Sequence, residues 1–271
     1  MNREEAEQVL IEAGRGADEA FPLLEAAVAC SLHDDPTRDP ALARELGAAG
    51  VDRLRQRLKG ESAEEALAEA MAGDLGLNGD LFTYEHPDNA DIIAVAERRK
   101  GLPVALGVYY LHVARSCGLT LQGVDFPGHF LLRIETEEGP LALDPFSQGR
   151  VVLPSELTRR ALHAGLTPNV ADRLDRLMAP VSDRAVLLRL QNNIFARATH
   201  VGAYARAERA ALRRALLNPT DHRPWLDVAA AREGLGALAG ALEALAKASE
   251  LDGGAALAAR AQRERMRLKL N

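Results

Sequence analysis

Residues 127–146 read PGHFLLRIETEEGPLALDPF, and this stretch decides the fold of the region around it. Two apolar runs, HFLLRIE and LALDPF, alternate in the way that is typical of β-strands with one buried face. The acidic residues and the Gly-Pro pair at 137–140 indicate a turn between them. The sequence therefore predicts two neighbouring antiparallel strands. Their more hydrophobic face carries Phe130, Leu132, Ile134, Leu141 and Leu143.

A histidine and an aspartate lie at the open ends of these two strands. With the turn centred near Glu137, His129 at the start of the first strand lies roughly opposite Asp144 at the end of the second. A carboxylate in that place can hold one imidazole nitrogen, which is the orienting half of a nucleophile, base and orienter triad. Two other interpretations stay open. His129 can be a strand-end histidine hydrogen-bonded into the structure, and Asp144, which precedes Pro145, can cap a turn.

A helix is predicted upstream of the hairpin, from Pro103 onward. Proline suits the first position of a helix, because its φ is fixed and its missing N–H is not needed there. Apolar residues then recur at helical spacing, and Gly118 ends the helix. A strand over residues 121–126 follows. The apolar stripe of the helix consists of Leu106, Tyr109, Tyr110, Val113 and Cys117.

The order of helix, strand, strand with histidine and strand with aspartate resembles the transglutaminase-like branch of the papain-like thiol enzymes. Three segments resemble more specifically the SirB-like family of bacterial proteins, over roughly residues 80–270. These segments are NADIIAVAERRKGLPVALGVYYLHVARSCGL at 89–119, GVDFPGHFLLRI at 123–134 and LALDPF at 141–146. The resemblance implies an α+β fold with a papain/transglutaminase-like core, a small antiparallel sheet, N-terminal helices and a C-terminal tetratricopeptide-like (TPR-like) helical segment.

The same resemblance implies roles for single residues. His129 matches the base and Asp144 the orienter of the transglutaminase pattern, whereas the position of the nucleophilic cysteine falls on Pro103. Proline has no nucleophilic atom, so we expect a degenerate, non-catalytic domain that binds a protein or peptide segment. The candidate binding residues are Arg98, Arg99, Phe130 and Tyr109.

The two arginines fit an anion at the mouth of a cleft, although a solvated helix C-terminus is the commoner meaning of such a pair. An enzymatic alternative is a hydrolase or acyl transferase that uses His129 and Asp144 with water or a non-cysteine nucleophile. Ser147 is a candidate nucleophile, but a serine in a Ser-Gln-Gly stretch is more often part of a turn. A third alternative is a structural scaffold in which the central domain supports the C-terminal helices.

The composition is that of a folded globular protein. Charged residues make up 27% and hydrophobic residues 47% of the 271 residues, with a net charge of −6. This acidic balance, without a basic stripe, argues against a nucleic-acid partner. The N-terminal MNREEAEQVL lacks the pattern of a signal peptide, and no apolar run approaches the roughly 20 residues of a membrane span. We therefore expect a cytoplasmic protein without a membrane partner.

The chain has two cysteines, Cys30 and Cys117, with no CxxC pair and no nearby histidine cluster. This argues against a disulfide framework and against a zinc site. Free cysteine is usually buried, so both are assigned to the core. We expect no metal and no cofactor.

Three segments are predicted along the chain. Residues 1–78 form an N-terminal helical segment, and residues 79–165 form the transglutaminase-like core. The polar, proline-containing stretch over 165–180 is the best candidate for a linker, with a short helix around Asp172 to Leu177 as an alternative within it. Residues 181–271 form an alanine-rich helical segment. In it, the pattern that starts at Ala207 recurs at Ala241, an offset of 34 residues that is the tetratricopeptide period.

Overall fold

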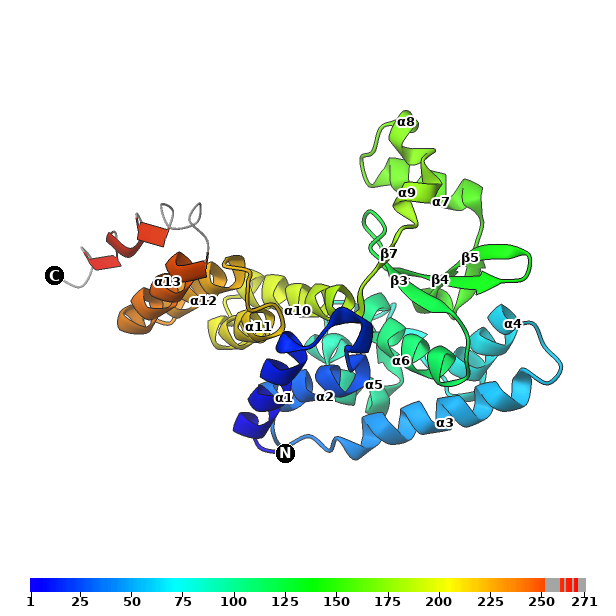
Figure 1. The fold of residues 1–271 in the computed structure, drawn as a ribbon, viewed down its shortest axis with the longest axis horizontal. Helices are drawn as coiled ribbons and strands as arrows, with labels where there is room; N and C mark the ends of the chain where they lie inside the picture. The colour runs from blue at the N-terminus through cyan, green and yellow to red at the C-terminus, as the bar shows by residue number, and fades with distance from the viewer. Residues whose placement is uncertain (252–258, 261, 265, 268–271) are drawn as a thin grey trace. The chain divides into compact units, whose positions relative to one another are not determined.

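The structure is a computed structural model, and it describes residues 1–251, 259–260, 262–264 and 266–267. The chain forms two compact units, and α2 (Leu23–Asp34) and α10 (Asp183–His200) contribute residues to both (Figure 1). We call them the helical unit and the sheet unit. The helical unit comprises Met1–Pro22, Ala29–Thr37 and Leu188–Asn271, and the sheet unit comprises Leu23–Val28 and Arg38–Leu187. The segment boundaries predicted at residues 78 and 165 stay predictions.

An antiparallel sheet of five strands forms the centre of the sheet unit, in the order β6-β5-β4-β3-β7. The predicted hairpin is present, with a two-residue turn that pairs Thr136 with Gly139. The predicted α+β fold class with a small antiparallel sheet is therefore confirmed. The strands are β3 (Leu121–Val124), β4 (Leu131–Thr136), β5 (Gly139–Asp144), β6 (Arg150–Val152) and β7 (Pro180–Val181), and a separate parallel pair consists of β1 (Asn78–Gly79) and β2 (Lys100–Gly101).

The predicted central helix is α6 (Pro103–Ser116), which packs against one face of the sheet. Pro103 occupies its first turn, and Gly118, with φ of 83°, follows its C-cap. Gly107 lies against the ring of Phe130, where a Cβ atom would overlap the ring carbon Cε1. Because glycine has no Cβ, the helix can approach the sheet closely enough for Phe130 to fill the gap.

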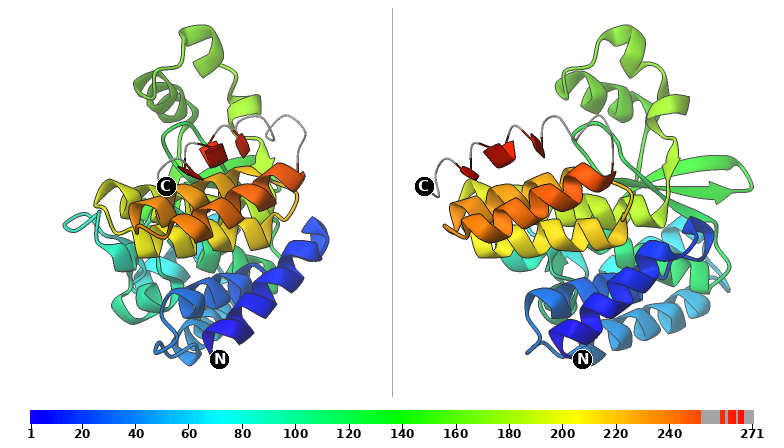
Figure 2. Two further views of the ribbon diagram at one scale, coloured as in Figure 1. Left: turned by 90° about the vertical axis from the view of Figure 1, so that its left-hand side faces the viewer. Right: turned by 60° about the vertical axis from the view of Figure 1, so that its left-hand side comes forward.

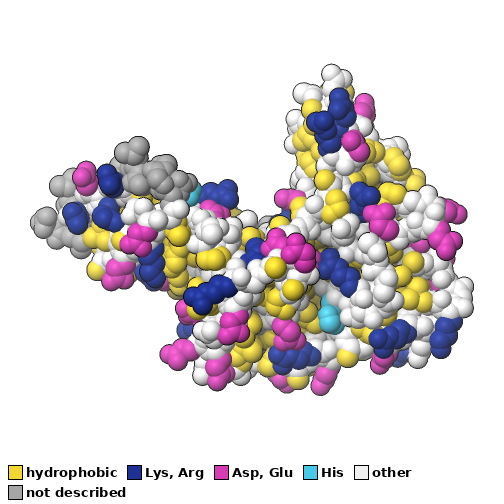
Figure 3. Space-filling model, viewed as in Figure 1, with side chains coloured by type: hydrophobic (Ala, Val, Ile, Leu, Met, Phe, Trp, Pro, Cys, Tyr) yellow, Lys and Arg dark blue, Asp and Glu magenta, His cyan; other side chains and the backbone are white. Residues whose placement is uncertain are grey.

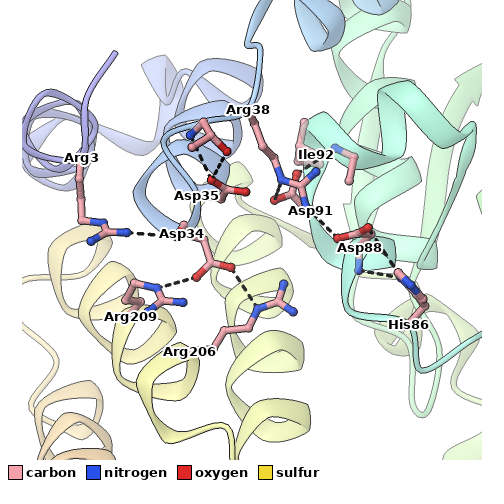
Figure 4. A network of polar contacts seen from close by, with 12 residues as sticks. Arg3, Asp34, Asp35, Arg38, His86, Asp88, Asp91, Ile92, Arg206 and Arg209 are labelled. Atoms are coloured by element: carbon pink, nitrogen blue, oxygen red, sulfur yellow. Dashed lines mark hydrogen bonds and ion pairs between the residues drawn. The ribbon is translucent and has the colours of Figure 1, made fainter.

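Further helices surround α6 in the sheet unit. Asp91 caps the start of α5 by accepting the Ala94 N–H at 2.9 Å. Arg38 joins this region through Asp88 at 2.8 Å and Asp91 at 3.2 Å (Figure 4). These ion pairs fix the chain that enters α5. The helical elements are α3 (Ala41–Arg57), α4 (Ala63–Ala68), η2 (Glu69–Asp74), η3 (Pro87–Ala90) and α5 (Ile92–Arg98).

The other face of the sheet is covered by α7 (Pro154–His163), α8 (Pro168–Ala171) and α9 (Leu174–Leu177) (Figure 1). Ala171 and Met178 are buried in one apolar cluster with the sheet residue Leu131. The stretch expected to be a linker is therefore folded onto the sheet. The short helix expected around Asp172 to Leu177 is present as α9, and Leu174 and Leu177 pack against this apolar cluster.

Alanine-rich helices make up the helical unit. Gly14 of α1 (Arg3–Arg15) lies against the backbone of Leu216 in α11 (Tyr204–Leu217). At this point α1 and α11 are in contact without intervening side chains. The last three described helices pack in sequence and lie side by side in both views of Figure 2. They are α11 (Tyr204–Leu217), α12 (Arg223–Gly234) and α13 (Leu238–Leu251), and α13 starts and ends 34 residues after α11. The end of the predicted repeat, at residues 252–253, lies outside the described residues.

The surface carries charges of both signs. Figure 3 shows acidic and basic side chains interspersed with hydrophobic ones over the visible face. No helix within the described ranges combines the length and the apolar character that crossing a membrane requires.

Replacing Gly107 by alanine is expected to destabilise the protein by about 1–3 kcal/mol, because the new methyl group overlaps Phe130 and overpacking costs this much. Helix propensity alone would favour the change by about 0.5–1 kcal/mol. The measurement is the free energy of unfolding in urea. Gly60→Ala is the control, since no atom lies within 4 Å of a Cβ at that position. A Gly107→Ala protein as stable as the wild type would contradict the packing of α6.

Candidate functional site

The histidine and the aspartate singled out by the sequence lie at one end of the sheet. The β4–β5 ladder ends with Leu132 opposite Leu143, so its next step places Leu131, and not His129, opposite Asp144. The two-residue turn at 137–138 therefore places Asp144 opposite a position two residues further along the chain than the predicted His129. His129 lies in the loop before β4, where its N–H donates to the Phe126 carbonyl at 2.9 Å.

The carboxylate of Asp144 is held by several donors. One oxygen accepts the backbone N–H groups of Phe146 at 3.0 Å and Ser147 at 3.3 Å, which start the short helix η4 (Pro145–Ser147). The other oxygen accepts the Ser147 hydroxyl at 3.1 Å and Arg160 Nη2 at 2.9 Å. Asp144 therefore caps a turn and pairs with an arginine. The hydroxyl of Ser147 donates to this same carboxylate.

Arg160 belongs to a chain of alternating charges on α7. Its guanidinium donates to Glu156, one turn earlier, with Nη2 at 2.7 Å and Nε at 3.1 Å. Glu156 also accepts a two-pronged contact from Arg150 of β6, at 2.6 and 2.9 Å. Hydrogen bonds from Arg150 and then from Arg160 lower the pKa of Glu156 to about 2. Asp144, Arg160, Glu156 and Arg150 thus form one network at the end of the sheet. Its two acidic and two basic side chains have opposite charges that cancel.

His129 is exposed at the edge of this network. Partial burial and then the charge of Arg160 lower its pKa, while Asp144 and Glu156 act in the opposite direction. The imidazole is therefore neutral at pH 7, the form that accepts a proton. The structure brings His129, Asp144, Arg160 and Glu156 together. Sequence reasoning missed Arg160 and Glu156, although their four-residue spacing, which places both on one face of a helix, was a signal.

Pro103, on which the resemblance places the nucleophilic cysteine, is the first residue of α6. The amide of the preceding Leu102 donates to the Asn89 carbonyl at 2.8 Å, which fixes this helix start. Cys117 is the C-cap of the same helix, about 20 Å along its axis, with its sulfur 3.6 Å from the Val51 carbonyl. Cys30 is buried and belongs to the helical unit. Neither cysteine lies at the start of α6.

The four predicted binding residues lie in different environments. Tyr109 is fully buried, with its hydroxyl donating to the Ile92 carbonyl at 2.7 Å, and Phe130 is buried against Gly107. Both therefore pack in the core and are not open to a partner.

The guanidinium of Arg98 donates to Asn89 at 2.8 Å and Asp80 at 3.1 Å. These bonds hold it inside the sheet unit. Arg99 is exposed and ends α5 in a left-handed conformation, with φ of 60°. The helix-terminus interpretation fits this geometry, because a left-handed residue is a usual way to end a helix.

A mostly apolar cavity of about 260 Å³ lies between the sheet and the α7–α9 segment. Arg133 of β4 and Asp175 of α9 are its charged lining residues. Its apolar lining includes Ala142, Val152, Leu153, Leu157, Leu174 and Met178. No cluster of three or more His, Cys, Asp or Glu side chains suited to a metal occurs in the part of the chain that the structure describes.

Similarity to known proteins agrees with this fold. A family model described as Transglutaminase-like superfamily matches residues 41–192, more than half of the chain. A UPF0162 protein of Xylella fastidiosa strain Temecula1 is 32% identical over 239 residues, which cover 86% of this chain and 85% of that protein. The chain therefore belongs to the transglutaminase-like superfamily and, within it, to the UPF0162 family.

Two shorter similarities concern about a third of the chain. A UPF0162 protein of Vibrio cholerae is 38% identical over 89 residues, covering 32% of this chain and 33% of that protein. F-box only protein 21 of Mus musculus is 31% identical over 100 residues, covering 34% of this chain and 16% of that protein. No solved structure matches the chain.

Replacing Arg160 by glutamine is expected to raise the pKa of His129, because the guanidinium charge disfavours the imidazolium. The measurement is an NMR titration of the His129 ring protons. Arg133→Gln serves as the control, since Arg133 pairs with Glu135 and does not act on His129. An unchanged His129 pKa in the Arg160→Gln protein would show that the two side chains are further apart than in this structure.

Proposed function

We propose that this protein is a SirB-like protein whose transglutaminase-like domain carries out no thiol acyl transfer and instead binds an extended protein segment. The observation that carries the proposal is Pro103 at the first position of α6. Thiol enzymes need a thiolate as nucleophile, and a helix N-terminus favours one by lowering the cysteine pKa. The proline keeps the helix start and removes the reacting atom.

The environment of Asp144 supports the same conclusion. A triad aspartate is used to hold the imidazole, whereas the Asp144 carboxylate accepts two backbone amides, a serine hydroxyl and an arginine. These bonds shape the turn after β5. The carboxylate thus serves the local fold whether or not a reaction takes place.

The apolar cavity next to Leu153 is the proposed recognition site. It is large enough for one aliphatic or aromatic side chain, whose burial contributes about 1.5–3 kcal/mol. Arg133 and Asp175 in its lining can interact with polar groups on either side of that side chain. The partner is therefore a peptide segment with a large apolar residue between polar ones.

Leu153→Asp is expected to weaken peptide binding by about tenfold or more, because it places a charge in the apolar lining. The probe is a set of short fluorescent peptides with a central leucine or phenylalanine between polar residues, and the measurement is fluorescence anisotropy. Leu162→Asp is the matched control. Leu162 is also an exposed leucine, at 41% against 62% for Leu153, but it does not line the cavity.

Equal affinities for wild-type and Leu153→Asp protein would rule out this cavity as the site. A second assay offers acyl-donor peptides and amines to a Cys30→Ser, Cys117→Ser protein. Turnover by this cysteine-free protein would refute the non-catalytic part of the proposal.

A hydrolase that uses water is the second candidate function, favoured by the lowered pKa of the exposed His129 beside Asp144. Its neutral imidazole is suited to take a proton from water. This function predicts that His129→Ala abolishes hydrolysis of ester or amide substrates while the melting temperature stays unchanged. Hydrolysis that persists in the His129→Ala protein would exclude it.

A further inference from the structure

Three arginines of α11 face the C-terminal end of α2 within the helical unit. Arg206, Arg209 and Arg213 follow one another at helical spacing on one face of α11. Arg209 Nε lies 2.8 Å and Arg206 Nε 3.0 Å from the carboxylate of Asp34, the last residue of α2 (Figure 4). Arg213 Nη1 is 3.6 Å from the same carboxylate. One aspartate therefore faces three guanidinium groups.

A fourth arginine is accounted for by the helix end. Arg3 donates to the backbone carbonyls of His33 at 2.9 Å and Asp34 at 3.3 Å. The C-terminus of a helix carries partial negative charge, which suits a cation there. Arg3 and the helix end therefore form one favourable contact.

Arg213 is the member of the group that lacks sufficient partners. Its side chain is fully buried, and its Nε donates to Gln191 Oε1 at 2.6 Å. Its two outer nitrogens, Nη1 and Nη2, have no hydrogen-bond acceptor among the described residues. These nitrogens carry four N–H donors, and burying such donors and their charge without acceptors is costly.

The positive field at this place also acts on His33. Burial, and then the charges of Arg213, Arg3 and Arg209, lower the pKa of the His33 imidazole to about 4, against the opposing charge of Asp34. His33 is therefore neutral at pH 7. Its buried Nδ1, like the outer nitrogens of Arg213, has no hydrogen-bond partner within the described ranges.

We propose that Arg213, together with Arg209 and Arg206, binds a small monovalent anion of the size of chloride inside the helical unit. The anion would accept the hydrogen bonds of Nη1 and Nη2 and offset the excess of guanidinium charge. A fully buried side chain favours a small ion, and the nearby Asp34 carboxylate disfavours a doubly charged one such as phosphate. The bound ion would stabilise the packing of α11 against α2.

The first experiment measures the melting temperature of the full chain while chloride replaces gluconate at constant ionic strength. An ion that binds only the folded state makes this temperature depend on its concentration. We expect a rise of about 3 °C for each tenfold increase in chloride above the dissociation constant. Bromide is expected to act like chloride, and phosphate to have no such effect.

Matched variants assign the effect to the cluster. Arg213→Gln is expected to abolish the chloride dependence, and Arg209→Gln, which keeps Arg213, to shift it to several-fold higher chloride. Arg232→Gln is the control, because Arg232 pairs with Glu208 outside the cluster and its loss should leave the dependence unchanged. If Arg213→Gln fails to fold, the Arg209→Gln comparison still decides the question. Identical chloride curves for wild-type and Arg209→Gln protein would overturn the proposal.

The thiol of Cys30 is the competing source of negative charge, because it also acts on Arg213. Cys30→Ala separates the two possibilities. An external anion predicts that the Cys30→Ala protein keeps its chloride dependence, whereas loss of that dependence would overturn the proposal in favour of a thiolate. Crystals soaked in bromide give a direct result. Anomalous density within hydrogen-bonding distance of Arg213 Nη1 and Nη2 is expected, and water alone at that place would overturn the site.

Discussion

The close approach of α6 to the five-stranded sheet is the constraint on which the rest of the sheet unit depends. Gly107 leaves the space that Phe130 fills, and Phe130 directly follows His129 along the chain. The position of the imidazole is therefore set by how closely a helix backbone can approach a strand. The hydrogen bond from the Leu102 N–H to the Asn89 carbonyl fixes the start of α6, where the superfamily resemblance predicts a thiol and this chain has Pro103. A packed helix start does not require a thiol, so the fold can persist without the chemistry.

The polar end of the sheet illustrates how one carboxylate can serve structure and chemistry alike. Asp144 caps the turn after β5 and pairs with Arg160, which in turn contacts Glu156. Loss of Arg160 would be costly, because it would leave the buried Asp144 carboxylate without its charged partner. Partial burial and then the charge of Arg160 lower the pKa of the neighbouring His129, while the charges of Asp144 and Glu156 act in the opposite direction. A neutral imidazole near a carboxylate is expected both for a catalytic base and for a structural histidine, so this environment fits either role.

The helical unit is packed mainly through small residues. Alanine and glycine side chains let its helices pack closely, as where Gly14 meets the backbone of Leu216. Small side chains contribute little apolar area each, so polar contacts carry more of the specificity. The arginines of α11 gather at Asp34, and the unmatched donors of Arg213 mark the point where the described side chains alone do not balance the charge.

The sequence by itself determined the period of the hairpin, the start of α6 at Pro103 and the 34-residue offset between α11 and α13, because these depend on local spacing and backbone preference. The α+β class followed from the family resemblance. The pattern placed Tyr109 and Phe130 on apolar faces but did not decide between core and binding roles, and it did not determine that Arg98 is held by Asp80 or that residues 168–178 fold onto the sheet. Arg160 and Glu156 became part of the candidate site only in three dimensions. Burial and ion pairing between distant segments decide such roles, and alternation along a single strand or helix carries no information about what packs across from it.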